Sequence, residues 1–285
     1  MNLEAVRSYA FSDVEHAYSR RDTMLYALGL GYGSDPLDPQ QLKFVYEDGL
    51  QAVPSIVNVL AHPGFWAKDP ALGIDWVRLL HGEQSFEIHR PIPAEGRLRG
   101  QYRIEAVQDM GASKGAKVYQ TKKLYDVESG DLVASVGTVL FLRGDGGSGG
   151  FGEFPTQPLP LPDGEPDTVV TYKTLPQQAL IYRLSGDYNP IHGDPAPAAK
   201  AGFRAPILHG LCSLGHATRA IIEACADNDP SRLKALSLRF SQPVYPGETL
   251  SVQIFSQPGG AVQFRCSVLE RNLVVLDRGR AVIQS

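Results

Sequence analysis

Alternation of apolar and polar residues runs through two parts of the chain, and each part contains four such segments. In the second part they cover residues 236–240, 250–254, 262–266 and 273–283. In the first part they cover residues 85–89, 98–107, 118–125 and 132–142. A period of two is typical of strands that bury one face, so each part is predicted to form four antiparallel strands.

One segment, residues 206–226, has a helical pattern instead. Apolar residues recur there at spacings of three and four, at Leu211, Leu214, Thr218, Ile221 and Cys225. We expect a long helix that is apolar nearly all round, with Pro206 in its first turn, because proline suits that position. Gly210 and Gly215 would weaken such a helix in isolation, so we expect them where its backbone packs closely against another element.

The two parts of the chain are related by a constant shift. Pro54 corresponds to Pro206, and residues 91–98 correspond to residues 243–250, each 152 positions later. One unit is therefore present twice. The predicted fold class is α+β, as a tandem (double) hot-dog fold in which each unit wraps a curved antiparallel β-sheet around a central helix.

Glycines followed by prolines separate the two units. The prediction is a first unit at residues 1–143, a linker at 144–167 and a second unit at 168–285. In the first unit the counterpart of the long helix, residues 54–61, meets Pro63-Gly64 after about two turns, where proline should end it. A shortened helix leaves volume inside the first unit.

Length and composition place the chain among ordinary globular proteins. It has 285 residues, of which 43% are hydrophobic and 20% charged. Its 27 basic and 31 acidic side chains give a formal charge of -4, with no basic run, so we expect no nucleic-acid partner. No apolar run approaches the roughly 20 residues of a membrane span. We find neither a secretory signal nor a peroxisomal Ser-Lys-Leu address, so we expect no membrane association and a cytoplasmic location.

One short segment gathers polar groups around turn residues. Asp187, Asn189 and His192 fall within six residues, and Gly186 and Asn189-Pro190 favour turns. A carboxylate beside an imidazole can hold a water molecule, take its proton and return a proton to carbon, which is hydration chemistry. The alternative is structural: Asp187 caps the loop, Asn189 makes an Asx turn, and His192 donates to a nearby carbonyl.

The whole segment resembles the signature of the MaoC-like and (R)-specific enoyl-CoA hydratase family. That signature has an aromatic residue, a spacer, an aliphatic and a small residue, then Gly-Asp-x-Asn-Pro, an aliphatic residue and His, with a small residue six positions on. The places are filled here by Tyr182, Leu184, Ser185, Gly186, Asp187, Asn189, Pro190, Ile191, His192 and Ala198. Residues 201–203 and 206–211 are similar to the family's entry into its central helix.

The resemblance implies an activity and a role for each site residue. The activity is hydration of trans-2-enoyl-CoA to (R)-3-hydroxyacyl-CoA, and the reverse dehydration, in fatty-acyl metabolism. Asp187 and His192 would be catalytic, Asn189 would support them, and the amide of Gly210 would bind the thioester oxygen. A helix amino terminus offers free N–H groups to a developing enolate, which agrees with that role; otherwise Gly210 serves packing alone. We expect no cofactor, a coenzyme A or acyl carrier protein thioester as substrate, and a homodimer.

The first unit lacks the catalytic groups. Gly31 stands where Asp187 does and Pro36 where His192 does, so only the second unit is expected to be catalytic. Two-unit members of the family, similar to peroxisomal multifunctional hydratases, show the same division. The first unit would then hold the acyl chain in the volume beside its short helix, unless its own side chains fill that volume.

Other assignments are open from the residues alone. His209 and His216 lie seven apart and could join Asp187 and His192 in a metal site. We expect His209 to brace the helix entrance, His216 to belong to the core and no metal to bind, because this hydration needs none. A hot-dog thioesterase would hydrolyse the thioester, and a non-enzymatic protein would only bind it; the Asp-x-Asn-Pro-x-His run argues against both.

Overall fold

The computed structural model describes residues 1–155, 160–162 and 164–284. Its strands are β1 (Val14–Tyr18), β2 (Leu79–Ile88), β3 (Gly96–Asp109), β4 (Ala116–Asp126), β5 (Leu132–Leu142), β6 (Thr168–Lys173), β7 (Leu233–Phe240), β8 (Thr249–Ser256), β9 (Ala261–Val268) and β10 (Leu273–Ile283). Its α-helices are α1 (Leu3–Arg7), α2 (Arg20–Leu28), α3 (Pro39–Leu42), α4 (Gln178–Tyr182), α5 (Pro195–Lys200) and α6 (Gly210–Cys225). Its short 3-10 helices are η1 (Pro54–Asn58), η2 (Trp66–Lys68), η3 (Pro70–Leu72), η4 (Trp76–Arg78), η5 (Arg183–Ser185), η6 (Pro190–His192), η7 (Pro230–Arg232), η8 (Pro258–Gly260) and η9 (Leu269–Arg271).

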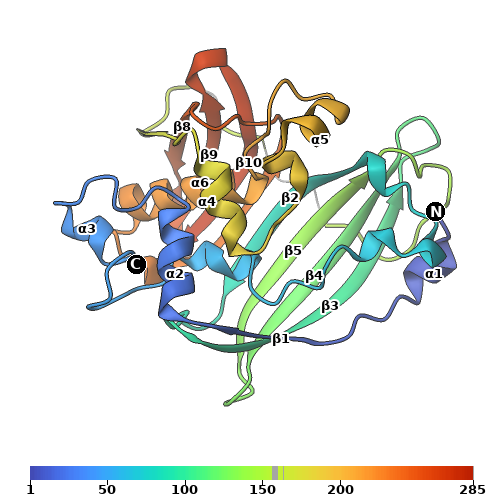
Figure 1. Ribbon diagram of the computed structural model, residues 1–285, viewed down its shortest axis with the longest axis horizontal. Coiled ribbons are helices and arrows are strands. Elements are labelled where there is room, and N and C mark those ends of the chain that lie inside the picture. The colour runs from blue at the N-terminus through green and yellow to red at the C-terminus, as the bar shows by residue number, and fades with distance from the viewer. Residues whose placement is uncertain (156–159, 163, 285) are drawn as a thin grey trace.

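The strands form one ten-stranded sheet in the order β1-β3-β4-β5-β2-β7-β10-β9-β8-β6. Every pairing is antiparallel. The first half of the chain supplies β1 to β5 and the second half supplies β6 to β10, so each half builds one half of the sheet (Figure 1). The strand order of the second half mirrors that of the first. The repeat in the sequence is therefore a repeat in the structure.

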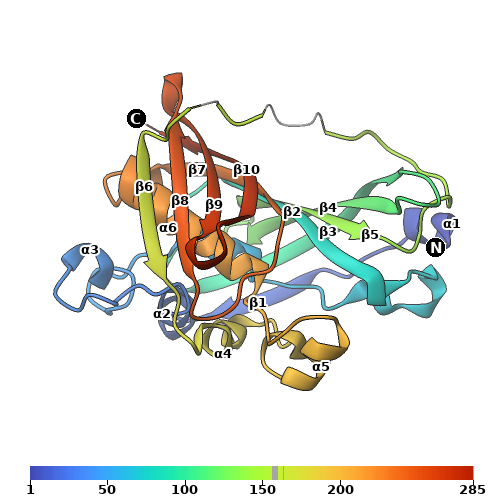
Figure 2. The same cartoon turned by 90° about the horizontal axis from the view of Figure 1, so that it is seen from above.

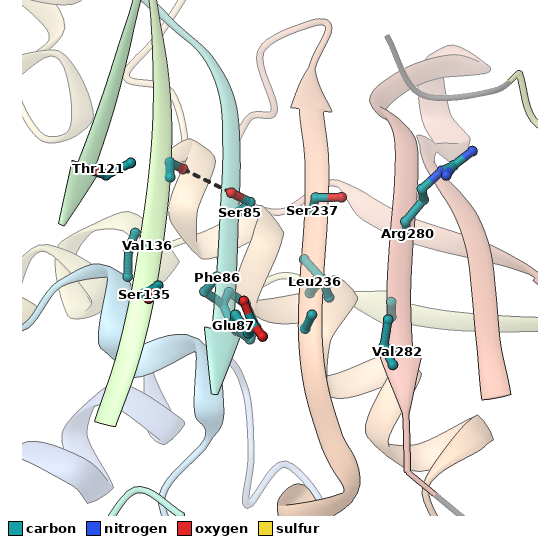
Figure 3. A pocket seen from close by; sticks show the side chains of 13 residues that line it. Ser85, Phe86, Glu87, Thr121, Ser135, Val136, Leu236, Ser237, Arg280 and Val282 are labelled. Carbon is teal, nitrogen blue, oxygen red and sulfur yellow. Dashed lines mark hydrogen bonds between the residues drawn. The ribbon is translucent and has the colours of Figure 1, made fainter. Parts of the chain in front are cut away.

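The two halves join where β2 pairs with β7. Ser85 lies directly opposite Ser237 in this pairing, and the two serines are 152 residues apart in the sequence. Because each serine is the counterpart of the other, the axis that relates the halves passes between them. Figure 3 shows both serines in an open groove that crosses β4, β5, β2, β7 and β10, with the helices behind the strands. The groove contains none of the site residues predicted from the sequence.

All eight predicted strands are present, as β2 to β5 and β7 to β10. The prediction of four strands in each half is nevertheless wrong by one, because β1 and β6 add a strand at each edge of the sheet. They pair with β3 and β8, respectively. Most residues of β1 and β6 are exposed or half-buried. Edge strands with so little buried surface lack the apolar alternation by which strands are found in a sequence.

The helix α6 lies inside the curve of the second half of the sheet, as predicted. It contacts β6, β7, β8 and β10, and its middle residues, 212–222, are buried (Figure 2). A Cβ on Gly215 would overlap the side chain of Leu30, so this glycine does allow close packing. The predicted start at Pro206 is wrong. The N–H groups of Ile207 and Leu208 donate to carbonyls elsewhere, at 3.1 and 2.7 Å, and keep the backbone out of the helix until Gly210.

In the first half the central element is η1, one five-residue 3-10 helix with every residue buried. It contacts α6, β2 and β5, so it occupies the centre of the first half as α6 occupies that of the second. The predicted shortened helix is thus present, but it ends at Asn58, three residues earlier than expected. After it the backbone turns at Ala61, which has a φ of 50°, a left-handed conformation.

Between β5 and β6, the described residues form no helix or strand apart from one bridge between Phe151 and Val107. The predicted linker at 144–167 covers this stretch, and its residues 156–159 and 163 lie outside the described part of the chain. Among the described residues, no helix is long and apolar enough to cross a membrane.

Candidate active site

The loop between α4 and α5 carries the predicted pair. Gly186, with a φ of 119°, turns the chain after η5. The Oδ1 atom of Asp187 then accepts the N–H of Asn189 at 3.1 Å, and the Oδ1 atom of Asn189 accepts the N–H of Ile191 at 3.3 Å. Asn189 thereby caps η6, which Pro190 begins. These successive turns return His192 to the side of Asp187.

His192 is buried, and its Nδ1 atom lies 2.8 Å from the carbonyl oxygen of Ile207. A carbonyl can only accept, so Nδ1 carries the proton and Nε2 is left as the acceptor. The turn contacts expected from a purely structural loop are all present, yet they use Nδ1 of His192 and Oδ1 of Asp187. The Nε2 and Oδ2 atoms take no part in them, so the same contacts orient a reactive pair.

His209, the residue before α6, supports this pair. Its ring stacks on that of His192, with centroids 3.8 Å apart and planes 25° apart. Its Nε2 atom donates to the backbone oxygen of Asp187 at 3.1 Å, while its buried Nδ1 atom has no hydrogen-bond partner among the described residues. His209 therefore connects the start of α6 to both members of the pair, which agrees with its predicted role as a brace.

Burial determines the charge of the two stacked imidazoles. It lowers the pKa of His192, against the opposing effects of the Ile207 carbonyl and the Asp187 carboxylate. Burial and the neighbouring His192 lower the pKa of His209 to about 4. Both rings are therefore neutral near pH 7, and His192 is ready to accept a proton through Nε2.

Two further histidines approach the site from the first half of the chain. Burial lowers the pKa of both His62 and His81, and the Asp187 carboxylate opposes this shift in each. The Nε2 atom of His81 lies 2.7 Å from Gln84 Oε1, and its ring packs edge-on against Phe240 with centroids 4.8 Å apart. Both histidines lie more than 100 residues before Asp187, so no local pattern in the sequence could have indicated them.

Gly210 is the first residue of α6. The N–H groups of a helix's first turn have no partner within the helix and lie at its positive end. A Cβ at this position would lie 3.1 Å from a ring carbon of Phe240, so a side chain would be crowded here. The residue thus places the N–H of a helix amino terminus directly after His209, whose ring stacks on that of His192.

Asp187, His192 and His209 each place one potential ligand atom within 4.8 Å of the others, so a metal site has to be considered. The stacking of the two imidazoles disfavours a shared ion. The lone pair of each nitrogen lies in its ring plane, and two nearly parallel planes do not converge on one ion. His216 is outside this cluster; it is buried in α6, with Nδ1 2.9 Å from the carbonyl of Cys212.

The loop of the first half that corresponds to the catalytic loop has different neighbours. Gly31 follows α2 with a φ of 75°, and a Cβ there would lie 3.4 Å from Arg219 Nη1 and 3.8 Å from His216 Nε2. Gly29, Gly31 and Gly33 lie in turns after the helix, which agrees with their interpretation as a loop.

Comparison with known proteins gives matches over both halves. The protein-family model described as "MaoC like domain" matches residues 158–273, and the family model described as "MFE-2 hydratase 2 N-terminal domain" matches residues 16–144. Peroxisomal enoyl-CoA hydratase 2 of Arabidopsis thaliana is 38% identical over 298 residues, covering 96% of this chain and 93% of that protein. The 3-hydroxyacyl-thioester dehydratase Y of Mycobacterium tuberculosis is 41% identical over 273 residues, covering 92% and 91%.

A solved structure extends the match to the fold. The crystal structure of a MaoC-like dehydratase from Phytophthora capsici has a TM-score of 0.88 and 33% identity, and each chain covers 100% of the other. The α+β double hot-dog prediction is confirmed. The chain belongs to the MaoC-like hydratase 2 family, in its two-unit form.

Proposed function

We propose that this chain is an (R)-specific enoyl-CoA hydratase, a hydro-lyase that converts trans-2-enoyl-CoA to (R)-3-hydroxyacyl-CoA and catalyses the reverse dehydration in fatty-acyl metabolism. The observation that carries the proposal is the arrangement of Asp187 and His192. Their ligand atoms lie within 4.8 Å of each other, while the loop contacts leave one carboxylate oxygen and one imidazole nitrogen for a water molecule. Relatives named as hydratase and dehydratase support the same reaction.

In the proposed reaction the pair holds one water molecule against the double bond. A proton leaves the water for the pair as the water oxygen bonds to the β-carbon of the enoyl group. The electrons of the double bond move towards the thioester carbonyl, and the α-carbon then receives a proton from the pair on the same face. Hydroxyl and hydrogen both come from water, so no oxidant, reductant or cofactor is needed.

The remaining site residues serve this step in different ways. The N–H of Gly210 donates to the thioester oxygen as negative charge develops on it. Asn189 caps η6 and so keeps His192 beside Asp187. The acyl chain extends into the first half, from which His62 and His81 approach Asp187. Dimerisation, a cytoplasmic location and the choice between coenzyme A and acyl carrier protein stay predictions.

The deciding experiment follows the enoyl-thioester absorbance after enzyme is added to crotonyl-CoA and to a medium-chain trans-2-enoyl-CoA. Thiol release and the configuration of the product are measured in the same samples. We expect absorbance to fall without thiol release, giving the (R) alcohol, and the reaction to vanish in Asp187→Asn and His192→Ala. Asp194→Asn is the matched control, because Asp194 only caps α5 and asparagine keeps a capping oxygen.

Other outcomes would identify other functions. Release of free thiol by the wild-type protein would make it a thioesterase. Binding of either thioester without any reaction would make it a non-enzymatic acyl-thioester-binding protein. Production of the (S) alcohol would contradict the proposed handedness while leaving hydration in place.

A further inference from the structure

Lys122 is a buried lysine in the middle of β4, and burial lowers the pKa of its side chain to about 7. It is 3% exposed, and none of the ion pairs within the described part of the chain includes it. Its Nζ atom instead donates to three backbone carbonyls, those of Val57, Asn58 and Leu60, at 2.7, 3.2 and 2.7 Å. Three acceptors match the three N–H groups of an ammonium, and the carbonyl end of a helical turn is its negative end. Lys122 therefore caps the carboxyl end of η1.

Tyr102 binds the backbone just after η1, at Ala61. Its hydroxyl donates to the carbonyl of Ala61 at 2.7 Å, while the N–H of Ala61 donates to His16 Nδ1 at 3.0 Å. Lys122 and Tyr102 are also neighbours, with Nζ 5.8 Å from the tyrosine ring centroid and the two residues paired across β3 and β4. Side chains from the sheet thus satisfy the backbone of residues 57–61, as further helical turns would have done.

The second half shows what these two residues replace. Tyr102 pairs with Lys122, and Ile254, which is 152 residues after Tyr102, pairs with Phe264. Ile254 and Phe264 are buried in the apolar core that also contains the inner face of α6. An apolar pair therefore lies with the long helix of the second half, and a polar pair lies where the first half has only η1. The polar pair Tyr102 and Lys122 thus occurs in the half that lacks a long central helix.

The segment that this pair holds is connected to the active site. Asn58 Oδ1 accepts from Gln84 Nε2 at 2.7 Å, and Gln84 Oε1 accepts from His81 at 2.7 Å. His81 packs against Phe240, which in turn lies over Gly210. Residues 57–61 therefore lie on the side of the site that faces the first half, where the acyl chain is proposed to extend.

We infer that Lys122 and Tyr102 are positioning residues that set the acyl-chain specificity of the site, by holding residues 57–61 in the place of a continued helix. The inference rests on the proposed function, with the acyl chain in the first half. Without the two side chains, residues 57–61 lose the groups that bind their carbonyls and move into the space for the chain. A long acyl chain is then excluded, while a short one, which does not reach this segment, still reacts.

The test compares kcat and KM for crotonyl-CoA and trans-2-dodecenoyl-CoA in the wild type, Lys122→Met and Tyr102→Phe. In Lys122→Met, the kcat/KM ratio of the long to the short substrate should fall by about tenfold or more, mainly through KM for the long one. Tyr102→Phe should shift the ratio in the same direction by less, because it removes a single hydroxyl. Lys123→Met, on the exposed face of the same strand, is the matched control and should leave the ratio unchanged.

The ratio distinguishes positioning from a general loss of structure. A merely structural defect lowers the rate for both substrates equally, so a ratio within about twofold of the wild type in folded Lys122→Met would overturn the inference. If Lys122→Met does not fold, the milder Tyr102→Phe decides by the same criterion. Failure of the wild type to hydrate either substrate would instead be a failure of the proposed function.

Discussion

Gly210 has two features that could matter for catalysis: its backbone N–H and its lack of a side chain. Replacing it by alanine and by proline tests the two features separately. Both variants add a Cβ, but only proline removes the N–H that is proposed to bind the thioester oxygen. The local backbone suits proline, because Gly210 begins α6 and the preceding residue, His209, has φ −59° and ψ 135°. The alanine variant is therefore the control for the proline variant.

The structure sets the expected size of each effect. A Cβ at position 210 lies 3.1 Å from Phe240, so the ring must shift slightly, at a cost of about 1 kcal/mol, or roughly fivefold in rate. Removing one donor to a developing oxyanion costs about 2.7–4 kcal/mol, or about 10²–10³ in kcat. The kcat of the Gly210→Pro variant should therefore be at least about two orders of magnitude lower than that of Gly210→Ala.

The assay is the loss of enoyl-thioester absorbance at saturating substrate, with circular dichroism and melting temperature measured for both variants. The donor contributes to the transition state more than to substrate binding, so the difference should appear in kcat more than in KM. Equal turnover by the two folded variants would refute the role of the Gly210 N–H. An equal, large loss in both would point to packing against Phe240 instead.

Three other outcomes follow from the site and the core. Asp187→Asn and His192→Ala should each lower kcat by about two to four orders of magnitude with melting temperatures close to the wild type, and a smaller loss would contradict their catalytic roles. The kcat/KM profile should fall in acid with a midpoint below the ordinary histidine value of 6.5, because burial lowers the pKa of His192 and only the neutral ring accepts a proton; a midpoint above 6.5 would contradict this. Folding stability should begin to fall as the pH drops below 6.5 and continue to fall down to the lowered pKa of His192, since the unfolded chain binds that proton more tightly. Gly215→Ala should lower the melting temperature, because overlap with Leu30 costs about 1–3 kcal/mol, which exceeds the gain in helix propensity of about 1 kcal/mol.

The parts of the fold that the sequence predicts are those that bury one regular face. The inner strands show or approximate a period of two and α6 repeats every three to four residues, so eight strands and the long helix follow from periodicity. The edge strands β1 and β6 do not follow, because most of their side chains remain partly exposed. The start of α6 does not follow either, since hydrogen bonds from Ile207 and Leu208 to distant carbonyls outweigh the suitability of Pro206 for a first turn.

The site divides in the same way. Asp187, Asn189 and His192 are close in the sequence and share one loop, so their motif predicts their proximity. His81 lies on β2, which joins β7 in a long-range pairing with no local signal, and His62 comes from the segment after η1, far from Asp187 in the sequence. Lys122 differs from these histidines, because its own strand carries a local signal of its burial.

The signal is the face of β4 on which Lys122 falls when buried and exposed positions alternate along the strand. It alternates in step with Val118 and Leu124, both of which are fully buried, so the period of two places its ammonium inside the core. A polar group at a buried position requires polar partners, and Lys122 finds them in the backbone carbonyls of residues 57, 58 and 60. A lysine in the buried phase of a strand therefore predicts polar acceptors in the core beside it.

The counterpart of Gly210 in the first half is Asn58, 152 residues earlier, and it lies at the opposite end of its helix. Gly210 begins α6 and offers an N–H, whereas Asn58 ends η1 and offers a carbonyl, which Lys122 already binds. We therefore predict that Gly31→Asp combined with Pro36→His, in an Asp187→Asn background, does not restore hydration of crotonyl-CoA. A Cβ at position 31 would lie beside the side chains of Arg219 and His216 in the middle of α6, so the new acid would not face a helix amino terminus that could stabilise a developing enolate. Recovery of even about one per cent of wild-type turnover would show that the acid and imidazole suffice without a helix amino terminus, and would contradict the role assigned to Gly210.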